Sequence, residues 1–235
     1  MDIGTGTGNL AIAAAHAVGR RGQVTGIDIS VGMLEKARQK ISAAAFSNVT
    51  LQWGDAETIS YPDHTFDHIL CANTFPWIMD KAATLQRWFR QLKPGGHIGI
   101  HTPADTAYVG PVLLQKILAN YDISLEPSNR IGSLQQCHEL FANAGFDALE
   151  IQTEQHGSYI PLDTVMASWE TIMVQPSLTA LQLSGDGIER LSPELLATIK
   201  AEFEAAANSL QTDQGVWNDL TTLYISGFKP KASLH

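Results

Sequence analysis

The chain has 235 residues, enough for one or two domains with a full hydrophobic core, which excludes a mini-protein held together by disulfides or metal. Apolar residues make up 44% of the sequence and charged residues 17%, a composition typical of a globular protein. The formal net charge of −9 argues against nonspecific binding to nucleic acid, because the phosphate backbone is also negative.

The sequence shows no sign of export or of a membrane anchor. The apolar run from Leu10 to Val18 is too short to span a bilayer and contains His16. Cys71 and Cys137 lie in apolar stretches with no CxxC partner, so we expect both to be reduced and buried. These features predict a cytoplasmic protein with no membrane anchor.

Short β-type runs alternate with helical ones, which predicts an α/β fold with a mostly parallel sheet flanked by helices. The predicted strands are 23–29, 49–53, 66–72, 97–101, 148–153 and 220–226. Apolar residues at helical spacing predict helices at 9–17, after the N-cap Ser30, from Leu85 to the Lys93–Gly96 turn, from Leu134 to Gly145, and after Ser192 with Pro193 at its first position.

Three alternate glycines, Gly4, Gly6 and Gly8, stand in the sequence Asp2-Ile3-Gly4-Thr5-Gly6-Thr7-Gly8 just before the first predicted helix. Such a turn lets the backbone approach a ligand closely, next to the free N–H groups of a helix N-terminus. A dinucleotide fingerprint needs a glycine or alanine three positions after Gly6, and Asn9 stands there instead. The spacing therefore differs from that of NAD-binding proteins.

Two acidic residues end the next two predicted strands. Asp28, twenty residues after Gly8, can accept hydrogen bonds from both hydroxyls of a ribose. Asp55 ends the following strand and can accept from an adenine amino group. With the glycine turn, these strand ends predict one crevice of nucleoside size.

These segments resemble the class I S-adenosylmethionine-dependent methyltransferases. The resemblance rests on DIGTGTG at 2–8, GIDIS at 26–30, GDAE at 54–57, FDHILCANTFPW at 66–77 and LKPGG at 92–96, which together span about half of the chain. A looser similarity links the chain to the small-molecule branch that includes trans-aconitate and ubiquinone/menaquinone methyltransferases. The resemblance implies a Rossmann-like sheet of the seven-stranded type with S-adenosylmethionine as cofactor.

The resemblance also implies roles for individual residues. Asp2 would orient the methionine amino end, and Gly4, Gly6 and Gly8 would pass the backbone beneath the methionine and ribose. Asp28 would hold the ribose, with Ile29 and Met33 against the adenine, while Asp55 and Ala56 would bind the adenine edge and Asn73 would lie beside the methionine. For Met33, a role in core packing is an equal alternative.

Methyl transfer needs neither a metal nor a covalent nucleophile, because the sulfonium already activates the methyl group; we therefore expect no metal site. His101, at the end of the predicted strand 97–101, which is the fifth strand in the order of the family, is the candidate general base for a hydroxyl acceptor. His156 and Tyr159 are weaker candidates. Phe75 and Trp77, which follow Asn73, are the candidate walls of the acceptor pocket.

The domain organisation follows from the same pattern. We expect a single methyltransferase domain over 1–235, with residues 1–101 as its cofactor-binding half. Residues 102–133 and 156–217 follow the predicted strands 97–101 and 148–153, the fifth and sixth strands in the order of the family. They are predicted to be helical insertions that form a substrate cap. Since Asp2 immediately follows Met1, we expect the first strand to be largely missing and the domain to be truncated at its N-terminus relative to the family.

The expected function is O- or C-methylation of a small molecule. A noncatalytic S-adenosylmethionine-binding protein stays open as an alternative, with an N-methyltransferase or an NAD-dependent enzyme ranked below it. Methyltransferases of nucleic-acid bases carry two prolines and an aromatic residue after the fourth strand, whereas Asn73-Thr74-Phe75-Pro76-Trp77 has one proline and an extra residue. That mismatch and the net charge both argue against a nucleic-acid substrate.

Overall fold

The computed structural model describes residues 1–123, 125–126, 133–174, 182–183 and 191–231. The chain divides into two compact units. The first contains Met1–Thr102, Ser133–Gln152 and Leu223–His235, and the second contains Pro103–Gly132 and Thr153–Thr222.

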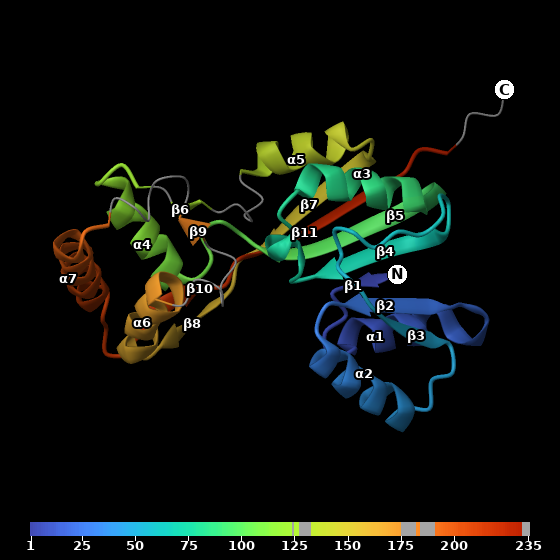
Figure 1. The fold of residues 1–235 in the computed structure, drawn as a ribbon, viewed down its shortest axis with the longest axis horizontal. Coiled ribbons are helices and arrows are strands. Elements are labelled where there is room, and N and C mark those ends of the chain that lie inside the picture. The colour runs from blue at the N-terminus through green and yellow to red at the C-terminus, as the bar shows by residue number, and fades with distance from the viewer. Residues whose placement is uncertain (124, 127–132, 175–181, 184–190, 232–235) are drawn as a thin grey trace. The chain divides into compact units, whose positions relative to one another are not determined.

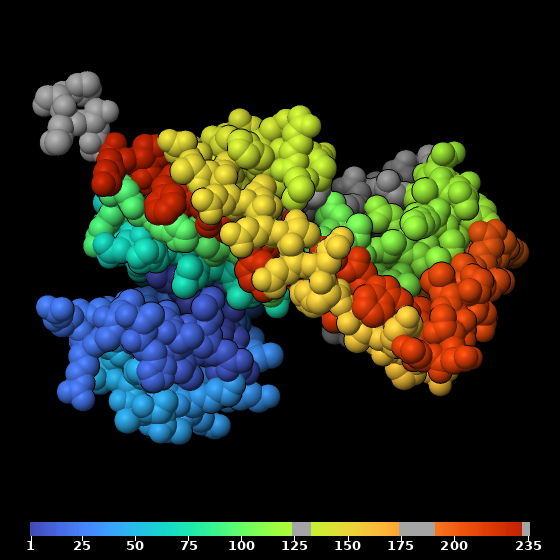
Figure 2. Space-filling view, turned by 180° about the vertical axis from the view of Figure 1, so that it is seen from behind, coloured from blue at the N-terminus to red at the C-terminus, as the bar shows by residue number. Residues whose placement is uncertain are grey.

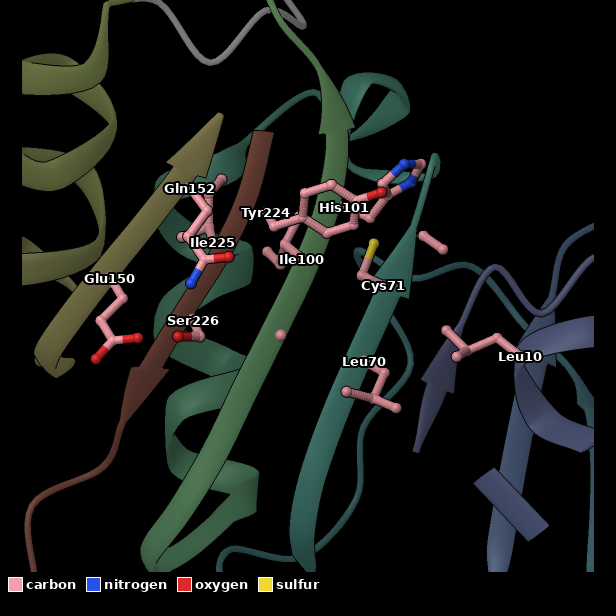
Figure 3. A pocket seen from close by; sticks show the side chains of 12 residues that line it. Leu10, Leu70, Cys71, Ile100, His101, Glu150, Gln152, Tyr224, Ile225 and Ser226 are labelled. Atoms are coloured by element: carbon pink, nitrogen blue, oxygen red, sulfur yellow. The ribbon is translucent and has the colours of Figure 1, made fainter. Parts of the chain in front are cut away.

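A seven-stranded sheet forms the centre of the first unit, in the order β3-β2-β1-β4-β5-β11-β7 (Figure 1). The pairs β1–β2, β2–β3, β1–β4 and β4–β5 are all parallel. The arrow of β11 points opposite to those of β4, β5 and β7 (Figure 3), so the sheet is mixed. The expected Rossmann-like fold is confirmed. The strands are β1 (Asp2–Ile3), β2 (Val24–Asp28), β3 (Val49–Trp53), β4 (Phe66–Ala72), β5 (Leu92–Pro103), β7 (Asp147–Glu154) and β11 (Thr222–Phe228).

Helices cover this sheet as right-handed crossovers require. From β1 to β3 each new strand is added toward one edge of the sheet, and from β4 to β5 the next strand is added toward the other edge. Right-handed crossovers therefore place the helices of these two halves on opposite faces of the sheet. Helices α1 (Asn9–Val18) and α2 (Val31–Ala43) both pack against β2 and β3. On the other side, α3 (Lys81–Gln91) packs against α5 (Leu134–Asn143) (Figure 1).

The predicted helix starts are confirmed. Ser30 caps α2, because its Oγ accepts a hydrogen bond from the backbone N–H of Met33 at 3.3 Å. Ser192 caps α7 (Pro193–Ser209) in the same way, and Pro193 occupies the first turn. Each serine satisfies an N–H group that has no partner inside its helix.

The first strand has only two residues, as expected, yet it lies in the middle of the sheet. Asp2 is paired with Gly26 of β2 and Leu70 of β4. Met1 extends the pairing, because its amino group donates to the His68 carbonyl at 2.7 Å and its carbonyl accepts from Leu70 N–H at 2.8 Å. Ile3 is completely buried, so this short strand anchors the start of the glycine turn.

The expected end of α3 at the Lys93–Gly96 turn was wrong. The helix ends at Gln91 and the chain continues directly into β5, which begins at Leu92 rather than His97. The pairing register with β4 jumps from Phe66↔Leu92 to His68↔His97, so residues 93–96 bulge out of the strand. Lys229, which follows β11, binds the end of α3, because its Nζ donates to the carbonyls of Phe89 and Leu92 at 2.8 and 2.9 Å.

The second unit is built around packed helices. Trp169 and Phe203, both buried, contact each other with ring centroids 5.8 Å apart, and they share a core with Leu114, Val165 and Ile199. A two-stranded antiparallel sheet pairs β8 with β10. The elements of the second unit include α4 (Val109–Ala119), β6 (Leu125–Glu126), β8 (Gly157–Ile160), α6 (Leu162–Trp169), β9 (Gln182–Leu183), α7 and β10 (Val216–Asp219).

Cys71 and Cys137 are both buried, as predicted. Within the described ranges, no helix combines the length and the hydropathy that a membrane span needs.

Candidate cofactor site

A cavity of about 470 Å³ lies at the carboxyl ends of β1 to β4, within the first unit. Ligands of open α/β sheets bind at this edge, where the direction of the chain crossing reverses. The strand order places that reversal between β1 and β4. The cavity is lined by Gly4, Gly6, Ile27, Asp28, Ile29, Ser30, Met33, Gly54, Asp55, Ala56, Glu57, Ala72, Asn73, Thr74, Trp77 and Ile78.

The glycine turn forms the floor of this cavity. Gly4, Gly6 and Gly8 have φ angles of 63°, 55° and 84°, in the left-handed region that side chains disfavour. At Gly4 there is also no space for a side chain, because an added Cβ would lie 1.9 Å from Thr74 Oγ1. Gly8 does not line the cavity; it is the N-cap of α1 and lies against Ala37. The turn is therefore fitted to the loop after β4 and to α2.

Asp2 precedes the glycine turn and binds it through Thr5, but it is not one of the cavity-lining residues. Its side chain is 2% exposed and accepts a hydrogen bond from Thr5 Oγ1 at 2.6 Å. Burial raises the pKa of this carboxyl to about 6, against a partial opposing effect of the Thr5 hydroxyl. Its implied contact with the methionine amino group stays a prediction.

Asp2→Asn tests whether this carboxyl pKa is raised. A carboxyl whose pKa is higher in the folded state makes the fold most stable below pH 4, and that contribution is lost as pH rises through about 6. We expect the free energy of unfolding of the variant, relative to wild type, to increase by roughly 2–3 kcal/mol from pH 4 to pH 7. Urea unfolding at four pH values measures this; a constant difference would contradict the raised pKa.

Asp28 connects the glycine turn to the start of α2. One carboxylate oxygen accepts from Gly6 N–H at 2.7 Å and the other from Ser30 N–H at 2.8 Å. These two bonds hold the carboxylate at the cavity wall, and each oxygen retains capacity to accept a further hydrogen bond. Ile29 and Met33, on the same side, are 64% and 42% exposed.

Asp55 and Ala56 form the wall that follows β3. Asp55 Oδ1 accepts from the Glu57 N–H at 2.8 Å, and the Asp55 carbonyl accepts from Ile59 N–H at 2.8 Å. The Ala56 carbonyl accepts from the indole N–H of Trp88 at 3.3 Å. The loop is thus fixed to α3 as well as folded on itself.

The loop after β4 supplies the opposite wall. Asn73 lines the cavity with a φ of 57°, and its N–H donates to the His101 carbonyl at 2.9 Å. Trp77 also lines the cavity and is 52% exposed. The expected role of Phe75 as a wall of the acceptor pocket does not agree with its position. Phe75 is completely buried near Trp88 and Phe141, so it belongs to the core.

The side chain of His101 is absent from the lining of this cavity. Its ring lies against the ring of Tyr224, with centroids 5.0 Å apart, over the face of the sheet that Figure 3 shows, which β4, β5, β11 and β7 form. That face holds a second cavity of about 390 Å³, and Figure 2 shows this side hollowed between the blue N-terminal residues and the yellow residues of β7. Ala72 lines both cavities, so His101 stands on the far side of the end of β4.

Several lining residues were missed from the sequence. Ser30, Gly54, Glu57 and Thr74 each lie within two positions of a predicted site residue at a strand end. Their proximity to those strand ends was an available signal. Ile78 carried no such signal, because it reaches the cavity only through the short helix η2 (Phe75–Trp77).

The charge of the cavity is one-sided. Its lining contains three carboxylates, Asp28, Asp55 and Glu57, and among the described residues that line it there is no lysine, arginine or histidine. Such a surface favours a ligand with positive charge and disfavours a pyrophosphate.

Comparison with known proteins agrees with this geometry. Residues 1–145 match the family model described as "Methyltransferase domain". The demethylmenaquinone methyltransferase of Geobacillus kaustophilus is 30% identical over 173 residues, which cover 67% of this chain and 74% of that protein.

Solved structures show the same fold. The YcgJ protein of Bacillus subtilis superposes with a TM-score of 0.62 at 21% identity, covering 98% of this chain and 91% of that one. Phosphoethanolamine N-methyltransferase 2 of Haemonchus contortus, solved with S-adenosyl-L-methionine, gives a TM-score of 0.58 at 19% identity, covering 98% of this chain and 48% of that one. The sheet order, the glycine turn and the family match together assign the chain: it belongs to the class I S-adenosylmethionine-dependent methyltransferases, and S-adenosylmethionine is its cofactor.

Proposed function

We propose that this enzyme methylates oxygen or carbon of a small organic acceptor, with the cofactor bound in the 470 Å³ cavity. The observation that carries the proposal is the glycine floor of a cavity whose charged lining residues, Asp28, Asp55 and Glu57, are all acidic. Such a cavity suits an adenosine group linked to a sulfonium and an ammonium group. The clash that a Cβ at Gly4 would make with Thr74 shows how closely the floor is fitted. The residues present therefore fit the cofactor.

Each wall has a proposed role. Asp28 accepts hydrogen bonds from the ribose hydroxyls, and Ile29 and Met33 cover the adenine. Asp55 accepts from the adenine amino group and the Ala56 N–H donates to the ring. Asn73 lies beside the methionine. These roles are supported by the lining of the cavity and by the fixed orientation of the two aspartates.

Bound S-adenosylmethionine supplies a methyl group that is already electrophilic. The chain's own task is to align the acceptor and to exclude water from the reacting atoms. Trp77, half exposed at the rim, is the proposed acceptor wall. For a hydroxyl acceptor we propose His101 as the general base, on the support of its position beside Asn73 and of the Ala72 boundary that the two cavities share.

The acceptor class is proposed from the relatives. The Geobacillus relative is named a demethylmenaquinone methyltransferase, which favours a hydroxylated aromatic acceptor of the quinol type. In this proposal residues 1–235 act as one methyltransferase domain, and residues 102–133 and 156–217 form the cap over the acceptor.

The test is a methyl-transfer assay with isotopically labelled S-adenosylmethionine. Reduced naphthoquinone, catechol and a bacterial metabolite extract are offered separately, and the labelled product is identified by mass spectrometry and NMR. We expect label on carbon or oxygen of an aromatic product. Cofactor binding without any labelled product would favour a noncatalytic binding protein, and label on nitrogen would overturn the proposed acceptor chemistry.

A further inference from the structure

We propose that Glu57 is a positioning residue that joins the two walls of the cofactor cavity. It would fix the distance between the adenine side, at Asp55 and Ala56, and the acceptor side, at Trp77 and Ile78. The naming of the two walls as adenine side and acceptor side rests on the proposed function. The link between the walls through Glu57 can be tested without an acceptor.

The carboxylate of Glu57 makes two hydrogen bonds to the acceptor-side loop. Oε1 accepts from Met79 N–H at 2.8 Å, and Oε2 accepts from Asp80 N–H at 2.9 Å. Bonds from N–H groups to a charged carboxylate are about twice as strong as bonds between neutral groups. Glu57 therefore holds both amides at once across the cavity edge.

The backbone of Glu57 is bound on the adenine side. Its N–H donates to the Asp55 carboxylate at 2.8 Å, and its carbonyl accepts a hydrogen bond from the Arg87 guanidinium. One residue thus contacts the proposed adenine acceptor through its main chain and the opposite loop through its side chain. A displacement of either wall is transmitted to the other through these bonds.

The rest of the acceptor-side loop is fixed at other points. Asn73 N–H is bonded to the His101 carbonyl, and Phe75 is buried in the core. Lys81 Nζ donates to the Ile78 carbonyl at 2.8 Å. Trp77 N–H also donates to the Thr74 carbonyl at 2.9 Å. The two amides that Glu57 binds follow Trp77 and Ile78 directly, so loss of the carboxylate would remove two of the bonds that hold this part of the wall.

A role limited to helix capping does not account for these contacts. Asp80 already caps α3, because its carboxylate accepts from Ala83 N–H at 2.9 Å. The amides that Glu57 binds, at Met79 and Asp80, precede the first residue of that helix. The carboxylate therefore orients the loop that leads into α3.

The experiment compares Glu57→Gln and Glu57→Asp with wild type. Glutamine loses the charge and turns one acceptor into a donor, whereas aspartate keeps the carboxylate on a shorter side chain. Glu35→Gln is the matched control, since Glu35 is an exposed α2 residue and the substitution removes the same charge. The readouts are S-adenosylhomocysteine affinity by calorimetry, thermal melting, and 19F NMR of 5-fluorotryptophan protein, with Trp77 and Trp53 assigned through Phe variants.

We expect Glu57→Gln to weaken S-adenosylhomocysteine binding about tenfold. In the ligand-free protein, the same substitution should shift or broaden the Trp77 resonance and leave the Trp53 resonance unchanged. Glu57→Asp should recover part of the affinity, and Glu35→Gln should match wild type. An unchanged Trp77 resonance in Glu57→Gln would overturn the inference, as would equal shifts at Trp77 and Trp53 with a lower melting temperature. If wild type fails to bind, the proposed function fails, yet the Trp77 signal still decides the role of Glu57.

Discussion

Asp28→Ala is expected to weaken S-adenosylmethionine binding at least about a hundredfold, equivalent to roughly 3 kcal/mol. The substitution removes the proposed acceptor of both ribose hydroxyls. It also removes the bonds from Gly6 N–H and Ser30 N–H, so the glycine turn loses its connection to α2. Isothermal titration calorimetry with S-adenosylmethionine measures the effect.

The control for this prediction is Asp67→Ala, which removes the same side chain from another strand. Asp67 is exposed and forms a surface ion pair with Lys93 at 2.8 Å. Such pairs contribute about 0–1 kcal/mol to stability, and this one includes no cavity residue. The control should bind the cofactor as wild type does; a similar loss in both variants would show that Asp28 is not a specific ligand.

Gly4→Ala is expected to abolish cofactor binding and to destabilise the fold by about 3 kcal/mol or more. The added Cβ would lie 1.9 Å from Thr74 Oγ1 and 2.6 Å from Thr74 Cβ, at a backbone φ of 63°. Either the turn or the loop after β4 must move, and both belong to the cavity. Urea denaturation and calorimetry measure the two effects.

Two further variants separate space from backbone strain at this position. Thr74→Gly, combined with Gly4→Ala, removes the colliding atoms and should recover part of the stability, leaving the cost of the positive φ. Gly32→Ala lies in α2 with nothing within 4 Å of the new Cβ, so it should stabilise the protein by about 0.5–1 kcal/mol. If Gly4→Ala behaved like Gly32→Ala, the fitted floor would be refuted.

The sequence predicted the sheet and one side of the cavity well, because these depend on local pattern. The predicted strands at 49–53 and 66–72 coincide with β3 and β4. Asp28 and Asp55 were found from the rule that ligands meet the carboxyl ends of parallel strands, and both line the cavity.

The remaining parts depend on contacts that no local pattern contains. Phe75 follows Asn73 by two positions, but it turns into the core because Trp88 and Phe141 provide an apolar site there. Glu57 was part of a recognised motif, yet its partners, the amides of Met79 and Asp80, are more than twenty residues away. The early start of β5 likewise depends on Lys229, whose contacts could not be read from residues 93–96.

Lys229 links the order of synthesis to the packing of α3. It binds the last carbonyls of α3, which were made about 140 residues earlier, and its own N–H donates to the Gly96 carbonyl at 2.8 Å. Contacts of such long sequence separation slow folding, because the loop between them must close first. During synthesis, α3 and the loop that Arg87 attaches to it would therefore reach their final packing only after the segment that carries Lys229 has been made.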